Sequence, residues 1–378
     1  LPGELGYGVE APNATVQIRG QTSSRNAQKN YKIELKKNKG SWRGQRTIAL
    51  NKHMGEGLRF RNKMAYDLIK GIDQMMGLRT QFVHLYVKDL TDSDTGAFVD
   101  YGLYTQVEQL NKTALKAHGL DSTGQLYKIN SFEFHRNEDI IRLTTDPAYD
   151  QTAFEQLMEI KGNSDHSKLI EMLDVLNDES SSMDEEVFAR YFDPENIAYW
   201  LAFQLLTGNT DTQSRNVYLY SPQNSDCWYL LDWDNDGMLR RKEREIIQFS
   251  DSESWERGVS NYWGNVLFRR CLQTESFRQL LSGERDRMKE LLAEEEKIFC
   301  NCYLSESGQS LEAVHKGYEE VRLKFVNKEI QNKTEENEIC SIDRIMEIIR
   351  KNLSDENLSV NGIAEQVGVT PSHLSRYF

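Results

Sequence analysis

Residues 208–216 have the sequence Gly-Asn-Thr-Asp-Thr-Gln-Ser-Arg-Asn, and residues 231–236 have the sequence Leu-Asp-Trp-Asp-Asn-Asp. Both segments place carboxylates and a carboxamide directly beside apolar residues. Burying such charges costs free energy unless a cation compensates them. The two segments therefore predict a site for a magnesium ion and a nucleotide.

The spacing within the first segment is that of a phosphoryl-transfer enzyme. Asp211 precedes Asn216 by five residues, as the catalytic-loop Asp precedes the metal-binding Asn in protein kinases, and a second acidic segment follows one hairpin later. In such enzymes one carboxylate orients the acceptor hydroxyl while others hold the metal ion against the phosphates. The alternative is that Asp211 is a turn residue that caps its own backbone.

Three carboxylates occupy alternate positions in the second segment, at 232, 234 and 236, and they repel one another unless a metal ion is bound. The segment also matches every place of a calcium-hand loop, with Asp232, Asp234, Asp236, Gly237 and Glu243. A calcium hand needs a helix before the loop, whereas Cys227–Leu231 predicts a strand. On spacing alone, magnesium, calcium and a metal-free acidic turn all stay open.

The chain resembles the spore coat protein H (CotH) kinase family, whose members are atypical kinases with a divergent protein-kinase-like fold. The resemblance covers residues 12–300 in family order. It is carried by Ile18–Ser23, Lys29–Ile33, Leu58–Asp67, Gly102–Glu108, Asn209–Asp211 with Asn216, and Trp233–Asp236. It implies an α+β, two-lobed kinase-like fold and an ATP-dependent protein kinase that phosphorylates Ser or Thr of a spore coat or cell-surface protein.

Taken position by position, the resemblance implies that Asp211 is the catalytic acid and that Asn216 and Asp234, with Asp236, bind the metal ion. It favours Mg²⁺ or Mn²⁺, with Ca²⁺ at residues 232–243 as the alternative. It also implies that the region from Arg19 to residue 32 binds the phosphates.

The basic N-terminal region supports an anion site there. Residues 1–70 contain 14 Lys and Arg against five Asp and Glu, whereas the whole chain has a net charge of −13. Residues 15–19 and 31–35 alternate apolar and polar side chains and predict strands, so the loop between them can present polar groups to phosphate. The candidate phosphate-binding residues are Arg19, Ser23, Lys29 and Lys32, although exposed strand lysines are an equal alternative.

Further elements follow from apolar periodicity. A helix is predicted from Phe60 to a stop at Gly77, and strands are predicted at 81–87 and 98–106. Glu108, at the end of the last strand, is the candidate partner for a phosphate-binding lysine, although an exposed Glu is the alternative. Asp193-Pro-Glu begins a helix that leads into the Asp211 segment.

The sequence predicts three parts. Residues 1–300 form the kinase-like domain, with a β-rich lobe at about 1–130 and a helical lobe at about 150–300. The Lys-, Glu- and Asn-rich composition within 301–338 is typical of a linker. Residues 339–378 resemble the first half of an AraC-type DNA-binding domain, with a helix-turn-helix at 358–378. This tail is not net basic, so a helix pair without DNA binding is the alternative.

No apolar run is long enough to predict a membrane span, and five scattered cysteines predict reduced thiols rather than a disulfide framework. The resemblance favours the spore coat or cell surface, whereas a genuine helix-turn-helix would favour the cytoplasm. Two alternative functions stay open. One is a non-catalytic coat or surface protein with a degenerate kinase fold, and the other is a DNA-binding transcription regulator that acts through the tail.

Overall fold

The computed structural model describes residues 12–20, 23–54, 59–89, 97–180, 183, 185–207, 209–238, 262 and 264–294. These residues form an α+β fold of helices and antiparallel sheets, as the sequence predicts. The predicted linker at 301–338, the predicted helix-turn-helix tail at 339–378 and Glu243 lie outside them. Within the described part, no helix combines the length and apolar character needed to cross a bilayer.

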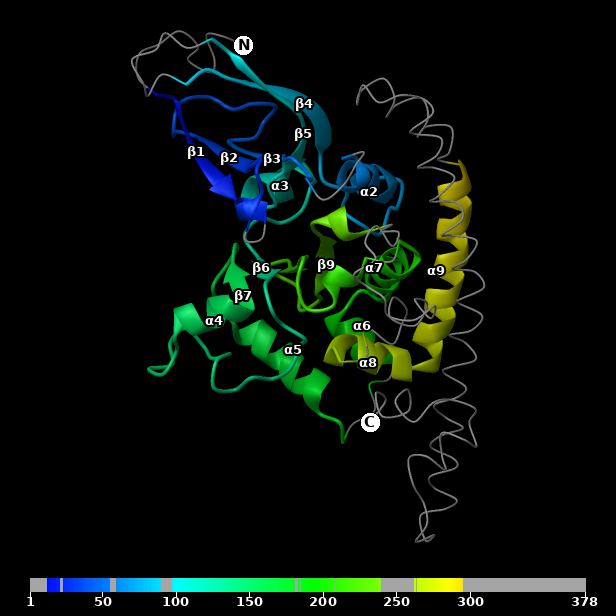
Figure 1. Ribbon diagram of the computed structural model, residues 1–378. Coiled ribbons are helices and arrows are strands. Elements are labelled where there is room, and N and C mark those ends of the chain that lie inside the picture. The colour runs from blue at the N-terminus through cyan, green and yellow to red at the C-terminus, as the bar shows by residue number, and fades with distance from the viewer. Residues whose placement is uncertain are drawn as a thin grey trace, which may run out of the picture.

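A five-stranded antiparallel sheet forms the upper part of the molecule in Figure 1. Its strands, in spatial order, are β1 (Ala14–Arg19), β2 (Asn30–Leu35), β3 (Thr47–Asn51), β5 (Val99–Glu108) and β4 (Thr80–Val87). The four strands predicted for this region are confirmed, and their ends differ from the predicted ones by at most two residues. Of the residues that the sequence predicts to bind phosphate, Arg19 lies on β1 and Lys32 on β2, whereas Ser23 and Lys29 lie between these two strands.

A second antiparallel sheet lies in the middle of the molecule (Figure 1). Its strands, in spatial order, are β7 (Met158–Ile160), β6 (Gln125–Ile129), β8 (Val217–Ser221) and β9 (Tyr229–Asp232). The sequence predicts the β8–β9 hairpin but not β6 and β7, because strands this short show too little periodicity. The region expected to be helical therefore also contains strands.

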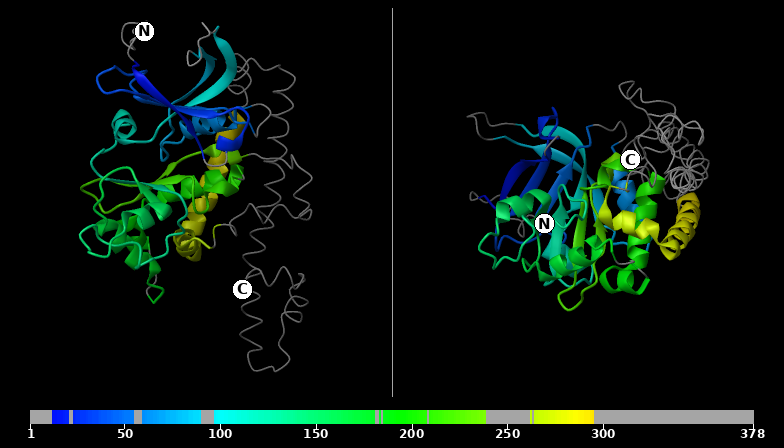
Figure 2. Two further views of the ribbon diagram at one scale, coloured as in Figure 1. Left: turned by 60° about the vertical axis from the view of Figure 1, so that its left-hand side comes forward. Right: turned by 90° about the horizontal axis from the view of Figure 1, so that it is seen from below.

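The helices of the described residues surround the second sheet and support the first. They are α2 (Arg61–Ile69), α3 (Lys112–Ala117), α4 (Gln151–Leu157), α5 (Ser167–Asn177), α6 (Glu185–Tyr191), α7 (Pro194–Thr207), α8 (Val266–Gln273) and α9 (Glu275–Glu294). α9 runs beside α7 along one flank of the molecule (Figures 1 and 2).

α2 is shorter than the sequence predicts. The prediction rests on five apolar residues at helical spacing, Phe60, Met64, Leu68, Ile72 and Met75, and all five are buried. The helix nevertheless ends at Ile69 rather than at Gly77. Gly71 is a poor helix former, and the chain after it folds back so closely that a Cβ on Gly77 would lie 2.9 Å from the backbone nitrogen of Lys70. The predicted burial is right and the predicted helix end is wrong.

α7 is the central helix and fixes the start of the Asp211 segment. Its N-terminus is capped as predicted, since the backbone N–H of Asn196 donates a hydrogen bond to Asp193 Oδ1 at 2.9 Å. Every residue from Asn196 to Thr207 is buried, so the helix is enclosed on all sides. Trp200 stacks on Phe268 of α8 with 5.4 Å between the ring centres. The chain therefore leaves α7 from a rigid point.

One apolar core joins α2, the second sheet and the helices α4 to α9. Among the described residues, β1, β2 and β3 contribute nothing to this core, and Val16 and Ile18 on the edge strand β1 are more than half exposed. The position of α2 relative to the β8–β9 hairpin is therefore set by close packing. This packing matters for the site, because both α2 and the hairpin contact the acidic loops.

Candidate functional site

The β8–β9 hairpin brings the two acidic segments to one place. The strands are antiparallel, with Val217 opposite Asp232. The residue before β8 and the residues after β9 therefore emerge at the same end of the hairpin. Asn216 and Asp234 occupy these two positions.

Asp211 joins this pair through direct contacts. It lies in the short 3₁₀ turn η2 (Thr210–Thr212) after α7, and Asn216 Nδ2 donates a hydrogen bond to Asp211 Oδ2 at 2.9 Å. A Cβ on Gly237 would lie 3.6 Å from the Asp211 Cβ, so the loop after β9 is adjacent. The Asp211 side chain is 55% exposed, which leaves it accessible to another molecule.

Both ends of the hairpin have an unusual backbone. Asn216 and Asp234 adopt left-handed conformations, with φ of 55° and 61°. Asn and Asp tolerate this region better than other non-glycine residues. Such conformations persist where the surroundings hold them, and they cluster at functional sites. Here the hydroxyl of Tyr66 on α2 accepts a hydrogen bond from the backbone N–H of Asp234 at 3.0 Å.

Charges from several segments converge on Asp234. Burial, together with Asp236 and Asp211, raises the pKa of Asp234 to about 6, although His53 and Arg19 act in the opposite direction. The Asp236 Oδ2 atom is 3.8 Å from His53 Nδ1. A cation bound here would relieve the repulsion among the three carboxylates.

A complete protein-only metal site is not present in the described part of the chain, where no three His, Cys, Asp or Glu side chains are grouped to hold an ion. In proteins, Mg²⁺ usually takes one or two carboxylates and completes its shell with water and substrate phosphates. The carboxylate of Asp234 and the carboxamide of Asn216 are donors of the required kind.

Asp232 supports the loop rather than facing the site. It is buried, its Oδ1 accepts a hydrogen bond from Gln204 Nε2 at 2.8 Å, and its Oδ2 accepts one from Asn235 Nδ2. Burial raises the pKa of Asp232 to about 6, although these two bonds oppose the shift. The backbone N–H of Asn235 in turn donates to Asn62 Oδ1 of α2 at 3.1 Å. The network fixes the 3₁₀ turn η3 (Asn235–Gly237).

The calcium-hand alternative gains no support from this geometry. The segment before the loop is strand β9, as predicted, and not a helix. Both oxygens of Asp232, the first residue of the pattern, are taken up by amide donors. The twelfth residue of the pattern, Glu243, lies outside the described residues.

Arg19 reaches this site from the five-stranded sheet. Its Nη1 atom donates a hydrogen bond to Asn51 Oδ1 at 3.1 Å, and its guanidinium carbon lies 5.8 Å from the centre of the Trp233 ring. Burial lowers the pKa of Arg19, and the nearby Asp234 carboxylate opposes that shift. Of the residues predicted to bind phosphate, Arg19 therefore lies beside the acidic loops.

Ser23 and Lys29 belong to the connection between β1 and β2, and their contacts are local. Asn30 Nδ2 donates a hydrogen bond to Ser23 Oγ at 2.9 Å. Lys29 Nζ donates one to the carbonyl oxygen of Ser24 at 3.0 Å. These bonds shape the connection, and phosphate binding by both residues stays a prediction.

Lys32 and Glu108 are paired with other residues. Lys32 Nζ lies 3.1 Å from Glu34 Oε2 on the same strand. The buried Glu108 carboxylate binds the Arg79 guanidinium and lies 2.8 Å from His118 Nε2. Burial alone would raise the pKa of Glu108, but the hydrogen bonds from His118 and Arg79 lower it to about 2. Glu108 thus binds Arg79 and His118, whereas the sequence suggests a lysine as its partner.

Gln204 and Tyr66 also support the site, and their roles do not follow from the sequence. Gln204 stands in a largely apolar helix and Tyr66 in a helix of mixed polarity, and the hydrogen-bond partners of both come from distant parts of the chain. The sequence could have indicated Tyr66 because it lies in residues 58–67, one of the segments that carry the family resemblance. For Gln204, burial inside an apolar helix indicates that its amide needs hydrogen-bond partners.

Comparison with known proteins gives one family. The family model described as CotH kinase protein matches residues 16–354 of the chain. The match spans all the candidate residues described above, from Arg19 to Asp236. The search of curated proteins finds no match.

Proposed function

This chain belongs to the CotH kinase family, and we propose that it is an atypical protein kinase that transfers the γ-phosphate of ATP to a Ser or Thr hydroxyl of a protein substrate. A spore coat or cell-surface protein is the proposed substrate class, from the family resemblance. The observation that carries the proposal is the meeting of Asp211, Asn216 and Asp234 at one end of the β8–β9 hairpin. These residue types, in this order, are those of the kinase catalytic and metal-binding loops.

The residues present fit a magnesium ion bound to a nucleotide. Asp234 offers a carboxylate, and Asp236 lies beside it. The amide nitrogen of Asn216 is engaged by Asp211, so the amide oxygen is the atom that would face a cation. Bound Mg²⁺ or Mn²⁺ would offset the negative charge of the phosphate oxygens during transfer.

Asp211 would act on the acceptor hydroxyl. In the transfer, the hydroxyl oxygen bonds to the γ-phosphorus, the bond from that phosphorus to the β-phosphate oxygen breaks, and ADP leaves. The hydroxyl proton passes to Asp211. The exposure of this carboxylate supports the role, because a protein acceptor must reach it. Arg19 and the connection that carries Ser23 and Lys29 would bind the phosphates.

We also propose a two-lobed arrangement. The five-stranded sheet with α2 would form the nucleotide-binding lobe, and the second sheet with α4 to α9 would form the other. The position of Arg19 next to Asp234 supports it, since these residues come from different sheets. Residues 301–338 as a linker and 339–378 as a truncated helix-turn-helix stay proposals from sequence.

A phosphoryl-transfer assay tests the site assignment. Purified protein with Mg²⁺ or Mn²⁺ and γ-labelled ATP should phosphorylate itself or dephosphorylated casein, used as a general acceptor. Asp211→Ala and Asp234→Ala should each lower transfer by about 100-fold or more. Asp139→Ala is the matched control, because that side chain is fully exposed.

Two outcomes would contradict the proposal. Transfer at the wild-type rate in both site variants would refute the roles of Asp211 and Asp234. Binding of ATP and Mg²⁺ without any transfer to casein or to the protein itself would instead favour the non-catalytic scaffold.

A further inference from the structure

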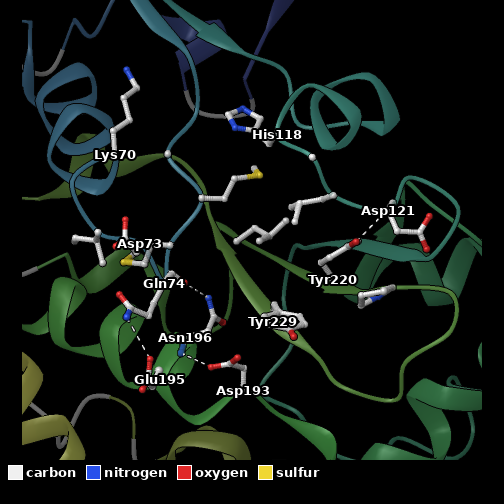
Figure 3. A pocket seen from close by; sticks show the side chains of 18 of the residues that line it. Lys70, Asp73, Gln74, His118, Asp121, Asp193, Glu195, Asn196, Tyr220 and Tyr229 are labelled. Carbon is white, nitrogen blue, oxygen red and sulfur yellow. Dashed lines mark hydrogen bonds between the residues drawn. The ribbon is translucent and has the colours of Figure 1, made fainter.

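A cavity of about 930 Å³ lies apart from the acidic loops (Figure 3). Its wall comes from four stretches: residues 70–79 after α2, residues 118–121 after α3, residues 193–196 at the start of α7, and the β8–β9 hairpin. Neither Asp211 nor Asp234 lines it. The volume lies in the upper part of the range of about 300–1,000 Å³ that is typical of ligand pockets. It can therefore hold several side chains of a partner.

Apolar side chains cover part of the wall. Met75 and Met76 come from the turn after α2, Leu120 from the segment after α3, and Leu231 from β9. Met76 and Leu120 are only partly buried, so they remain accessible. Methionine side chains adapt to different apolar shapes. This surface would contact apolar side chains of a bound molecule.

Four carboxylates also line the cavity: Asp73, Asp121, Asp193 and Glu195. Within the described part of the chain, none of them forms an ion pair with a Lys or Arg. Asp193 and Glu195 instead accept hydrogen bonds from the Asn196 N–H and the Gln74 amide (Figure 3). Among the described residues, these two carboxylates are therefore held by hydrogen bonds and not by ion pairs.

The cationic side chains of the wall are already paired. Lys70 binds Asp67, whereas Arg79 and His118 bind Glu108, and neither of these acids lines the cavity. Figure 3 shows Lys70 and His118 on the side opposite Asp193 and Glu195. The cavity thus combines an apolar surface with an acidic side, which disfavours phosphates and nucleic acids and favours a basic ligand.

We propose that this cavity docks a segment of the protein substrate in which Lys or Arg stands beside apolar residues. The apolar side chains would enter between the methionines and Leu231, and the cationic groups would pair with Asp73 and Glu195. The identification of the partner as a substrate rests on the proposed kinase function. The binding chemistry rests on the cavity alone.

The cavity is also connected to the candidate site through two elements. Leu231 lines the cavity, and Asp232 follows it directly in the network below the acidic loop. Lys70 lines the cavity at the end of α2, and Tyr66 on the same helix holds the backbone of Asp234. A docked segment would therefore contact the elements that position Asp234.

Selection from random-sequence peptides displayed on phage tests the binding chemistry without ATP. Peptides retained by the full chain should combine Lys or Arg with Leu, Ile, Met or Phe. A fluorescent copy of a retained peptide should bind the Asp73→Lys/Glu195→Lys variant about tenfold more weakly or worse. The Glu138→Lys/Asp139→Lys variant is the matched control, because it makes the same charge change at exposed positions outside the cavity. Met76→Asp should weaken binding through the apolar wall.

Three results would overturn the proposal: enrichment of acidic peptides, no enrichment at all, or equal binding by the cavity and control variants. Thermal unfolding of each variant checks that it is folded. Asp211→Ala should bind the peptide as the wild type does, so peptide binding can be measured even if the protein transfers no phosphate.

If transfer occurs, a kinetic experiment tests the docking role. Joining the peptide to a Ser-containing acceptor should lower the KM for that acceptor about tenfold, and the Asp73→Lys/Glu195→Lys variant should lose this decrease in KM at unchanged kcat.

Discussion

At the residue scale, the candidate site depends on carboxylates that lie close enough to repel one another. Asp211 and Asp236 repel Asp234 electrostatically at one end of the hairpin. The raised pKa of Asp234 reflects its burial together with this repulsion. A charge that is disfavoured in the free protein becomes favourable when a cation binds. The same carboxylates therefore lower the stability of the free protein and, under the proposed function, would favour the binding of a metal ion.

Asp234→Asn should stabilise the metal-free protein at pH 8. The pKa of Asp234 rises from 3.8 to about 6 on folding, so above pH 6 the folded state carries a charge that is less costly in the unfolded chain. The substitution removes that cost, by at most about 3 kcal/mol. Below pH 3.8 the carboxyl is protonated in both states and this contribution vanishes. Urea unfolding with EDTA between pH 4 and pH 8 measures the difference.

Magnesium with ATP should reverse the order of stability, because a ligand that binds only the folded protein stabilises it. The wild type should gain stability from Mg²⁺ and ATP, and Asp234→Asn should gain little. A variant that is less stable than the wild type at pH 8 without metal would contradict the electrostatic argument. An equal gain in both proteins would contradict metal binding at Asp234.

His166 should make the fold sensitive to acid. Burial lowers its pKa from 6.5 to about 4, and its ring stacks on Phe154 and contacts the hydroxyl of Tyr127. The folded state thus favours the neutral ring, so this contribution is complete above pH 6.5 and is lost as the pH falls to 4. The loss is at most about 3 kcal/mol. His166→Gln should unfold with a flatter pH dependence over this range, and equal slopes in urea unfolding would contradict the prediction.

The sequence predicts some of these residues better than others. Asp211 and Asn216 are predicted to lie close together because they are only five residues apart in the sequence. Asp234 is predicted to lie near Asn216 because the two residues flank one hairpin. The partners of Glu108 are harder to predict, because Arg79 lies just before strand β4 and His118 lies just after α3. Local patterns cannot distinguish such long-range partners from a lysine on β2.

At the element scale, α2 is the support of the acidic loop. It packs against η3, where Asn62 accepts a hydrogen bond from the Asn235 N–H and Tyr66 accepts one from the Asp234 N–H. Both side chains are buried. The helix therefore couples the apolar core to the backbone of the candidate metal ligand.

Tyr66→Phe should weaken this support while keeping the ring in the core. The substitution removes the hydroxyl that pairs with the Asp234 N–H, and an unpaired buried group costs about 1–3 kcal/mol. The free energy of unfolding should fall by this amount, and KM for ATP should rise several-fold because Asp234 is less well held. Tyr86→Phe is the control, because that side chain is 54% exposed. Equal effects of the two substitutions would show that the hydroxyl of Tyr66 has no special role.

Elements were predictable where their residues carry a local pattern. β1 and β2 alternate apolar and polar residues, and α7 begins after Asp193 with Pro194, so these elements follow from the sequence. The end of α2 depends on the tight return of Gly77 onto Lys70. β6 and β7 depend on pairing with each other and with β8. Tertiary contacts of this kind leave no periodic signal in a short segment.

At the scale of the whole molecule, the candidate site combines two sheets that belong to separate parts of the fold. Arg19 comes from the edge strand of the first sheet, whereas Asn216 and Asp234 flank the hairpin of the second. Among the described residues, the edge strand β1 contributes nothing to the large apolar core, whereas the second sheet is built into it. A ligand that binds both Arg19 and Asp234 would therefore link a weakly packed part of the fold to a strongly packed one.

ATP with Mg²⁺ should stabilise the protein by RT ln(1 + [L]/Kd), or about 3 kcal/mol at a hundredfold excess over Kd. Thermal unfolding with ATP, Mg²⁺, Ca²⁺ and ATP plus Mg²⁺ measures this, and the last mixture should give the largest increase in Tm. Arg19→Gln should remove most of that increase, because the guanidinium beside Asp234 is the contribution of the first sheet. Arg190→Gln, at a side chain that is 62% exposed, is the control. A full increase in Arg19→Gln would exclude the first sheet from ATP binding, and a response to calcium alone would favour the calcium-loop alternative.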